Sequence, residues 1–286
     1  MQAHDVTLKL PVLKITLKAW SSVARNLGLA CRLYWPWMAI GVVCLLAWGV
    51  GVLLNSGFSA PSPVLIGGAV WIPGLVMVLA TILAVPTVFV GWHRGIQSGT
   101  RPAQPIVIDA GVWGYIGYSL LIGVTLVLTV GLFALIATVI AGITTGLGDG
   151  PMSLERFAAL APFLPLAIVP YYILLSRFSL VLPAIAIGRT MSLGDSFQKT
   201  RGNTWRLTFG AGLIYLPVVL LSSTLEIVRL AFPDSMGLIG SVSILVLVAS
   251  LYCTHAALSF GTFALERLSP ADAMAADAMS LDAMAA

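Results

Sequence analysis

Five long stretches of the chain contain no charged residue. Asp, Glu, Lys and Arg are all absent from residues 33–93, 110–148, 157–176, 207–225 and 235–265. A charge at the centre of a membrane-spanning helix costs roughly 2.5 to 3.5 kcal/mol, whereas Leu, Ile, Val or Phe each return about 0.3 to 0.6 kcal/mol. Charged residues therefore mark helix ends, and the stretches between them predict helices that cross a membrane.

Six such helices are expected, because the first stretch is long enough for two. A spanning helix needs about 20 residues, and the breakers between Asn55 and Pro63 predict a turn in the middle of the first stretch. The expected spans lie within residues 37–54, 64–92, 112–141, 157–176, 207–225 and 238–265. The predicted fold class is an all-α polytopic membrane protein with six transmembrane helices and two short interfacial helices.

The composition excludes a soluble enzyme. Only 9% of the 286 residues are charged, against about 25% in an ordinary soluble domain, and the mean hydropathy is +1.00. The three cysteines form no Cys-x-x-Cys motif, which argues against structural disulfides and against a metal knuckle.

The positively charged residues are distributed unequally between the two sides of the expected membrane. With six spans both termini share one side, and that side carries thirteen of the 15 Lys and Arg residues, leaving Arg156 and Arg229 on the other. An excess of Lys and Arg marks the cytoplasmic side, so both termini are expected in the cytoplasm. The same distribution accounts for the isoelectric point near 9.1 without nucleic-acid binding.

Three regions are expected along the chain. Residues 1–32 form a basic amphipathic cytoplasmic segment, residues 33–268 form the six-helix transmembrane domain, and residues 269–286 form a low-complexity cytoplasmic tail. An Asp-Ala-Met repeat with a spacing of five residues produces no continuous apolar stripe in that tail.

Two short helices are expected outside the spans. Between Leu13 and Leu27 apolar residues recur at helical spacing, opposite a polar face that includes Lys14 and Ser22, which predicts a basic interfacial helix. Before Pro11 the alternation of apolar and polar residues leaves a short strand open as an alternative. A second interfacial helix is expected near residues 192–202, where Ser and Asp three residues apart resemble a capping box.

The sequence offers little catalytic chemistry. It contains no His-Glu-x-x-His, Gly-x-Ser-x-Gly or nucleotide-binding loop, so no catalytic, cofactor-binding or metal-binding residue is assigned and an enzyme is not expected. His255 is the one ionisable group well inside an apolar helix, which makes it a weak candidate for an intramembrane polar role. The alternative is a neutral imidazole bound to a neighbouring hydroxyl or carbonyl group.

Prolines raise the possibility of transport. Pro73 and Pro86 are expected to interrupt the second span, and Pro162, Pro165 and Pro170 the fourth. Broken helices in the two halves of a chain can mark a transport site, although proline is common in spanning helices. A small transporter or permease component with a path between these helices is therefore the alternative function.

The segment from Arg177 to Arg206 resembles a known family. It contains the sequence RFSLVLPAIAIGR from Arg177 and the sequence TRGNTWR from Thr200. These are similar to bacterial six-helix inner-membrane proteins, mostly of unknown function, that are labelled as membrane-domain-like relatives of glycerophosphodiester phosphodiesterase. The resemblance implies a bacterial inner-membrane location and an all-helical domain. It does not imply the phosphodiesterase activity, which in that enzyme belongs to a separate soluble barrel for which this chain has no room.

The predicted function follows from these features. We expect a non-enzymatic integral inner-membrane protein whose basic cytoplasmic face contacts anionic lipid headgroups or a membrane protein partner, with no cofactor and no nucleic acid. The candidate contact residues, most of them matching the family motif, are Arg177, Pro183, Arg189, Asp195, Lys199, Arg201, Asn203, Trp205 and Arg206.

Overall fold

The charge-free stretches form long helices. The computed structural model describes residues 9–56, 63–99, 104, 106–145 and 164–269. Its long helices are α2 (Leu27–Ser56), α3 (Pro63–Ser98), α4 (Ala110–Thr145), α6 (Leu164–Phe178), α9 (Thr204–Ala231) and α10 (Met236–Leu268). Six candidate spans are long and apolar enough to cross a membrane, the fourth being formed by α6 together with the short helix α7 (Val181–Ala186). The predicted all-α class with six spans is confirmed.

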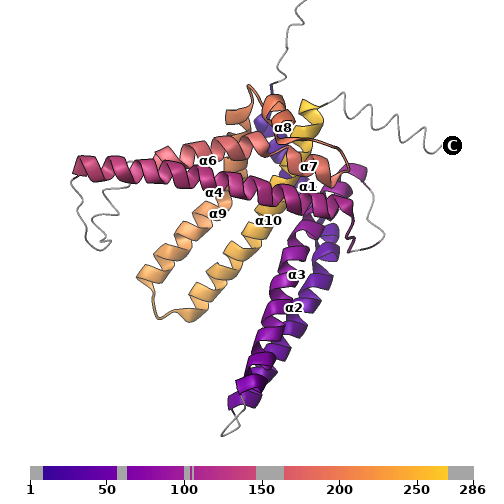
Figure 1. Cartoon of the computed structure of the whole chain (residues 1–286), viewed down its shortest axis with the longest axis vertical. Coiled ribbons are helices and arrows are strands. Elements are labelled where there is room, and N and C mark those ends of the chain that lie inside the picture. Colours follow the sequence, from indigo (N-terminus) through magenta and orange to yellow (C-terminus); the bar gives the residue numbers. More distant parts are fainter. Residues whose placement is uncertain (1–8, 57–62, 100–103, 105, 146–163, 270–286) are drawn as a thin grey trace, which may run out of the picture.

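The long helices pair as three hairpins that diverge from one region. Helix α2 packs on α3, α4 on α6, and α9 on α10, and Figure 1 shows the three pairs spreading apart. The region where they meet is called the hub here. It consists of α1 (Val12–Arg25), α7, α8 (Leu193–Lys199) and the adjoining ends of the long helices. Its core contains Trp92, Leu180 and Leu265, which are fully buried.

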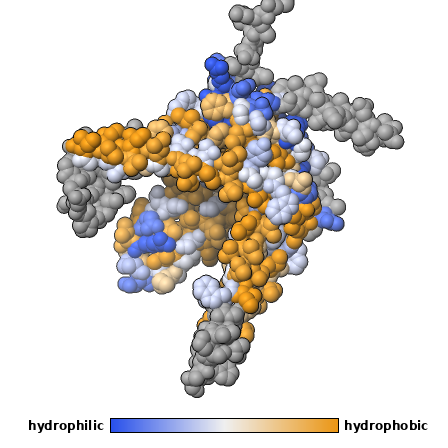
Figure 2. Space-filling view, viewed as in Figure 1, coloured by the Kyte–Doolittle hydropathy of each residue, from blue (hydrophilic) through white to orange (hydrophobic). Residues whose placement is uncertain are grey.

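Away from the hub the helices present apolar surface to their surroundings. Between 6% and 39% of the residues in the most apolar stretch of each span are buried within the chain. Figure 2 shows hydrophobic side chains along the hairpins, while hydrophilic ones gather around the hub and at the free end of α9 and α10. An exposed apolar area of this extent needs lipid or another apolar partner to cover it.

Helix α1 packs on the rest of the chain through residues that lie outside the apolar stripe predicted from the sequence. Ile15, Ala19 and Val23 are buried where α1 contacts α10 and α9, while Leu13 on the expected apolar stripe is exposed. Ser22, which was placed on the polar face, is buried. Helix α1 is therefore part of the hub, and the expected boundary at residue 32 falls inside α2.

The prolines do not break the helices as expected. Helix α3 continues through Pro73 and Pro86, and α6 continues through Pro170. Pro165 is the second residue of α6 and does not interrupt it, and Pro162 lies outside the described residues. Neighbouring helices and local hydroxyl groups can compensate for a hydrogen bond that proline removes within a membrane. The fourth span instead bends between α6 and α7, where Ser179 Oγ donates to the carbonyl oxygen of Ser176 at 2.7 Å.

Helix α8 begins with the capping box that the sequence predicted. The backbone N–H of Asp195 donates to Ser192 Oγ at 3.1 Å, and the N–H of Ser192 donates to Asp195 Oδ2 at 2.9 Å. These hydrogen bonds with Ser192 hold the pKa of the Asp195 carboxyl below its usual range. The helix ends at Lys199, and Gly202 follows with a φ of +80°.

Several expectations concern residues outside the described part of the chain. These are the turn within residues 57–62, the repeat in residues 270–286, and Arg156 on the expected outer side. The strand alternative before Pro11 lies partly there, over residues 1–8, while Lys9 and Leu10, which the structure describes, form no strand.

Candidate functional site

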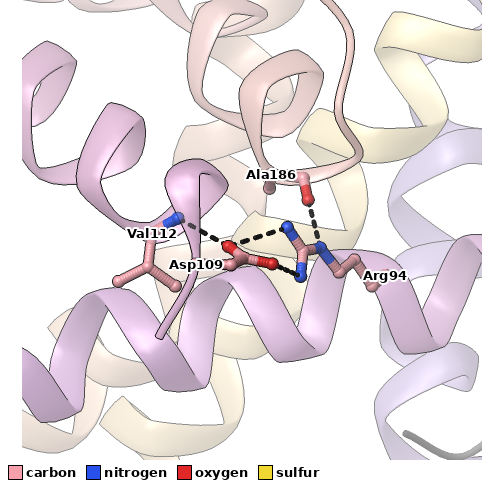
Figure 3. A network of polar contacts seen from close by, with 4 residues as sticks. All are labelled: Arg94, Asp109, Val112 and Ala186. Carbon is pink, nitrogen blue, oxygen red and sulfur yellow. Dashed lines mark hydrogen bonds and ion pairs between the residues drawn. The ribbon is translucent and has the colours of Figure 1, made fainter. Parts of the chain in front are cut away.

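Arg94, near the end of α3, joins three elements of the hub (Figure 3). Its Nη1 and Nη2 atoms donate to the two carboxylate oxygens of Asp109, at 2.6 and 3.2 Å, and its Nε donates to the carbonyl oxygen of Ala186 at 2.7 Å. Asp109 also accepts a hydrogen bond from the backbone N–H of Val112 at 3.1 Å. The network therefore fixes the start of α4 against the end of α3 and against α7.

The bridge between Arg94 and Asp109 is half-buried. The exposed fractions of the two side chains are 34% and 39%. The hydrogen bond from Arg94 is the main reason why the pKa of Asp109 lies below its ordinary value. A bidentate pair of arginine and carboxylate has a fixed geometry in addition to its charge attraction. The bridge therefore positions the end of α3 relative to the start of α4.

Two consecutive side chains of α3 bind α10. Trp92 Nε1 donates to Ser259 Oγ at 3.0 Å, and His93 Nδ1 lies 2.7 Å from Thr262 Oγ1. All four residues are buried. These polar contacts fix the register of the first hairpin against the third at the hub.

His255, the intramembrane candidate from the sequence, lies among aromatic rings. Its Nδ1 lies 2.9 Å from the carbonyl oxygen of Leu251, and because a carbonyl group can only accept, Nδ1 carries the hydrogen. The rings of Trp92 and Tyr34 stand edge-on to the imidazole, with centroids 4.6 and 5.4 Å away. This geometry favours the alternative of a neutral histidine held by a main-chain carbonyl group.

Asn203 and Arg206 hold the segment that precedes α1. The backbone N–H of Leu10 donates to Asn203 Oδ1 at 3.0 Å, and the carbonyl oxygen of Leu10 accepts from Arg206 Nη1 at 3.3 Å. Further along, the Tyr252 hydroxyl donates to the carbonyl oxygen of Trp20 at 2.7 Å. Asn203 and Arg206, two of the candidate contact residues, therefore bind the segment before α1 and hold it against the hub.

Arg177 joins the end of α6 to α8. Its Nη1 donates to the carbonyl oxygen of Phe197 at 3.0 Å, and its guanidinium carbon lies 4.5 Å from the centroid of the Phe197 ring. Its own carbonyl oxygen accepts from Ser196 Oγ at 2.6 Å. The side chain of Pro183, in α7, is buried.

The other candidates lie at the surface of the hub. Asp195, Arg201 and Trp205 are exposed, and Arg189 and Lys199 are half-buried. Asp195 and Lys199 lie on α8, and Arg177 and Trp205 line one surface pocket at the start of α9, whereas His255 is buried in the core.

Sequence reasoning missed the roles of His93, Arg94 and Asp109. The two charges flank the second and third spans and were interpreted only as helix ends. His93 is one of three histidines that lie far apart in the sequence, so no sequence pattern marks it. A carboxylate and a guanidinium at adjoining ends of consecutive spans are the signal that predicts such a bridge.

The chain is a multi-pass membrane protein, as its six apolar spans indicate. Within the residues that the structure describes, no three His, Cys, Asp or Glu side chains gather as metal ligands would. Comparison with models of protein families, with curated proteins and with solved structures gave no match.

Proposed function

We propose that this chain is a non-enzymatic integral protein of the bacterial inner membrane whose hub lies at the cytoplasmic face and contacts anionic lipid headgroups. The observation that carries the proposal is the juxtaposition of exposed cations and exposed apolar side chains on the hub. On α1, Leu13 and Leu17 are exposed beside Lys14 and Lys18, which are also exposed. Leucine in the interface and lysine among the headgroups is the pattern of a helix that lies on a membrane.

The start of α9 repeats this juxtaposition. Trp205 is 67% exposed, Phe197 is exposed on α8, and Arg201 is exposed between them. Tryptophan prefers the boundary between hydrocarbon and headgroups. A lysine or arginine near an anionic surface contributes about 1 kcal/mol, so several cations together favour anionic over neutral lipid.

The orientation in the proposal rests on where the cations lie. Those of the expected cytoplasmic side that the structure describes, Arg94 and Arg177 among them, occupy the hub end of the spans. At the free end of α9, Arg229 forms an exposed ion pair with Glu226 at 2.9 Å. The excess of cations at the hub supports a cytoplasmic hub. The bacterial inner membrane is proposed from the family resemblance of residues 177–206 alone.

The transporter alternative has less support. It was based on helices broken at prolines, and α3 is continuous through both of its interior prolines. The five charge-free stretches of the sequence contain no Asp, Glu, Lys or Arg side chain to hold an ion.

A triple variant tests the lipid contact. Arg206 is unsuitable because its guanidinium binds Leu10, so the variant replaces Lys14, Arg25 and Arg201, which are all exposed, with Gln. The purified variant should retain phosphatidylglycerol less strongly than wild type, by about 3 kcal/mol at low salt. This difference should shrink as salt screens the surface potential.

Arg229→Gln is the matched control, because it removes an exposed cation at the other end of the molecule. It should retain phosphatidylglycerol as wild type does. Equal retention by the triple variant and wild type, without salt dependence, would mean that these cations serve a protein partner and would overturn the proposal.

A further inference from the structure

A cavity lies where the second and third hairpins meet α7. Its volume is about 220 Å³, and its walls come from α3, α4, α6, α7, α9 and α10. Every residue that lines it is uncharged, and most are apolar. Its polar groups include His93, the hydroxyl of Tyr115, and the hydroxyls of Ser176 and Thr208, which bond to each other at 2.6 Å.

The mouth of the cavity faces the apolar surface between hairpins. Tyr172, Leu175 and Tyr215 line the cavity and are also exposed at the surface of α6 and α9. Exposed apolar surface on these spans is the part of the chain that meets lipid. A molecule therefore reaches the cavity from the bilayer without crossing a polar barrier.

His93 is one of the residues that line this cavity. Both contacts of the Thr262 hydroxyl are satisfied together when it donates to the carbonyl oxygen of Leu258, at 3.2 Å, and accepts from His93 Nδ1, at 2.7 Å. Nδ1 therefore carries the ring hydrogen, and Nε2 carries a lone pair. Nε2 is buried and has no hydrogen-bond partner in the part of the chain that the structure describes. Buried polar groups of this kind are normally satisfied.

We propose that the cavity binds an uncharged lipid with a free hydroxyl group, such as a monoacylglycerol or a long-chain alcohol, whose O–H donates to His93 Nε2. The uncharged lining disfavours a phosphate or ammonium headgroup, which would be buried without a counter-charge. A cavity of about 150 Å³ accommodates benzene, so this one holds the hydroxyl end of a single chain. The rest of the chain leaves through the mouth into the bilayer. This site is independent of the anionic headgroup contact.

Two photoreactive probes test the proposal without any substitution. The full-length chain is placed in phosphatidylcholine nanodiscs with hexadecanol that carries a diazirine near its hydroxyl group, or with the methyl ether of the same probe. The alcohol should crosslink to peptides containing residues 207–215 and 257–261 about tenfold more than the ether, because the ether cannot donate. Excess monoolein should compete with the alcohol. Equal crosslinking of the two probes at these peptides, as expected if only water fills the cavity, would overturn the proposal.

Three variants test whether His93 causes the preference for the alcohol over the ether. His93→Leu should crosslink alcohol and ether equally, whereas His255→Gln, with its imidazole outside the cavity lining, should keep the wild-type preference. Ala211→Phe, which fills the cavity from α9, should lower crosslinking of both probes and does not depend on how His93→Leu folds. An undiminished preference for the alcohol in His93→Leu, or undiminished crosslinking in Ala211→Phe, would contradict the assignment.

Discussion

At the scale of single residues, the bridge between Arg94 and Asp109 should make the stability of the hub depend on pH. The hydrogen bond from Arg94 lowers the pKa of Asp109 in the folded state below its ordinary value of 3.8. The stability from the bridge is then fully present above that ordinary value and is lost as the pH falls through the lowered pKa. Asp109→Asn should remove this pH dependence and cost about 1 kcal/mol near neutral pH, because the pair is partly exposed. Thermal unfolding in detergent between neutral pH and about pH 3 measures both effects.

Glu226→Gln is the control for this experiment. The pair of Glu226 and Arg229 is more exposed, at 64% and 50% of the two side chains, so its loss should barely change the melting temperature. An unchanged pH profile in Asp109→Asn would show that the bridge does not stabilise the hub.

Gly111 is needed because of the same bridge. A Cβ atom at this position would collide with Arg94 Nη2 and would lie 3.1 Å from Asp109 Oδ1, so the guanidinium would have to move. Gly111→Ala should therefore lower the melting temperature. Gly117→Ala, two turns later on α4 and with open space around its Cβ, should leave it unchanged or raise it, since alanine favours helix over glycine by about 1 kcal/mol. Equal melting temperatures for the two variants would contradict this role.

His255 should tolerate replacement by Gln. The amide N–H of glutamine can donate to the carbonyl oxygen of Leu251, as the imidazole Nδ1 does. We expect the amount of folded protein in the membrane and its melting temperature to stay close to wild type, measured by fluorescence-detected size exclusion. A large fall in either quantity would assign the imidazole a role that one hydrogen bond does not explain.

At the scale of elements, Asn203 should anchor α1. Replacing it with alanine leaves the buried N–H of Leu10 without a partner, which costs about 1 to 3 kcal/mol. The segment before α1 should detach more often, and trypsin should cleave faster after Lys14 and Lys18. Gln198→Ala, an exposed change on α8, is the control and should be cleaved at the wild-type rate. Identical cleavage of Asn203→Ala and the control would show that Leu10 is held elsewhere.

Features set by a local sequence pattern could be predicted, whereas features set by packing between helices could not. The spans could be predicted because a charge within a membrane is costly, and the cap of α8 because Ser192 and Asp195 are three residues apart. The buried face of α1 could not be predicted from the sequence, because α1 carries more than one apolar stripe. Its packing against α10 determines that Ile15, Ala19 and Val23 are the buried residues. The bend after α6 could not either, because proline marked the wrong positions and the turn forms at Ser179.

At the scale of the whole molecule, the hub brings together residues that are distant in the sequence. Leu10 meets Asn203, and Trp92 meets Ser259. No local sequence pattern predicts such contacts. Of the candidate site, only the motif between Arg177 and Arg206 could therefore be predicted from the sequence. The cavity at His93 emerges only once three hairpins are assembled.

The arrangement of the membrane spans can be tested by the side from which single cysteines react. In a background without Cys31, Cys44 and Cys253, Gln198→Cys places an exposed thiol on α8 of the hub, and Ser235→Cys places one in the turn between α9 and α10. With a cytoplasmic hub, a membrane-impermeant maleimide added to intact cells should label Ser235→Cys and should label Gln198→Cys only after lysis. Labelling of Gln198→Cys in intact cells, with Ser235→Cys protected, would contradict the cytoplasmic position of the hub.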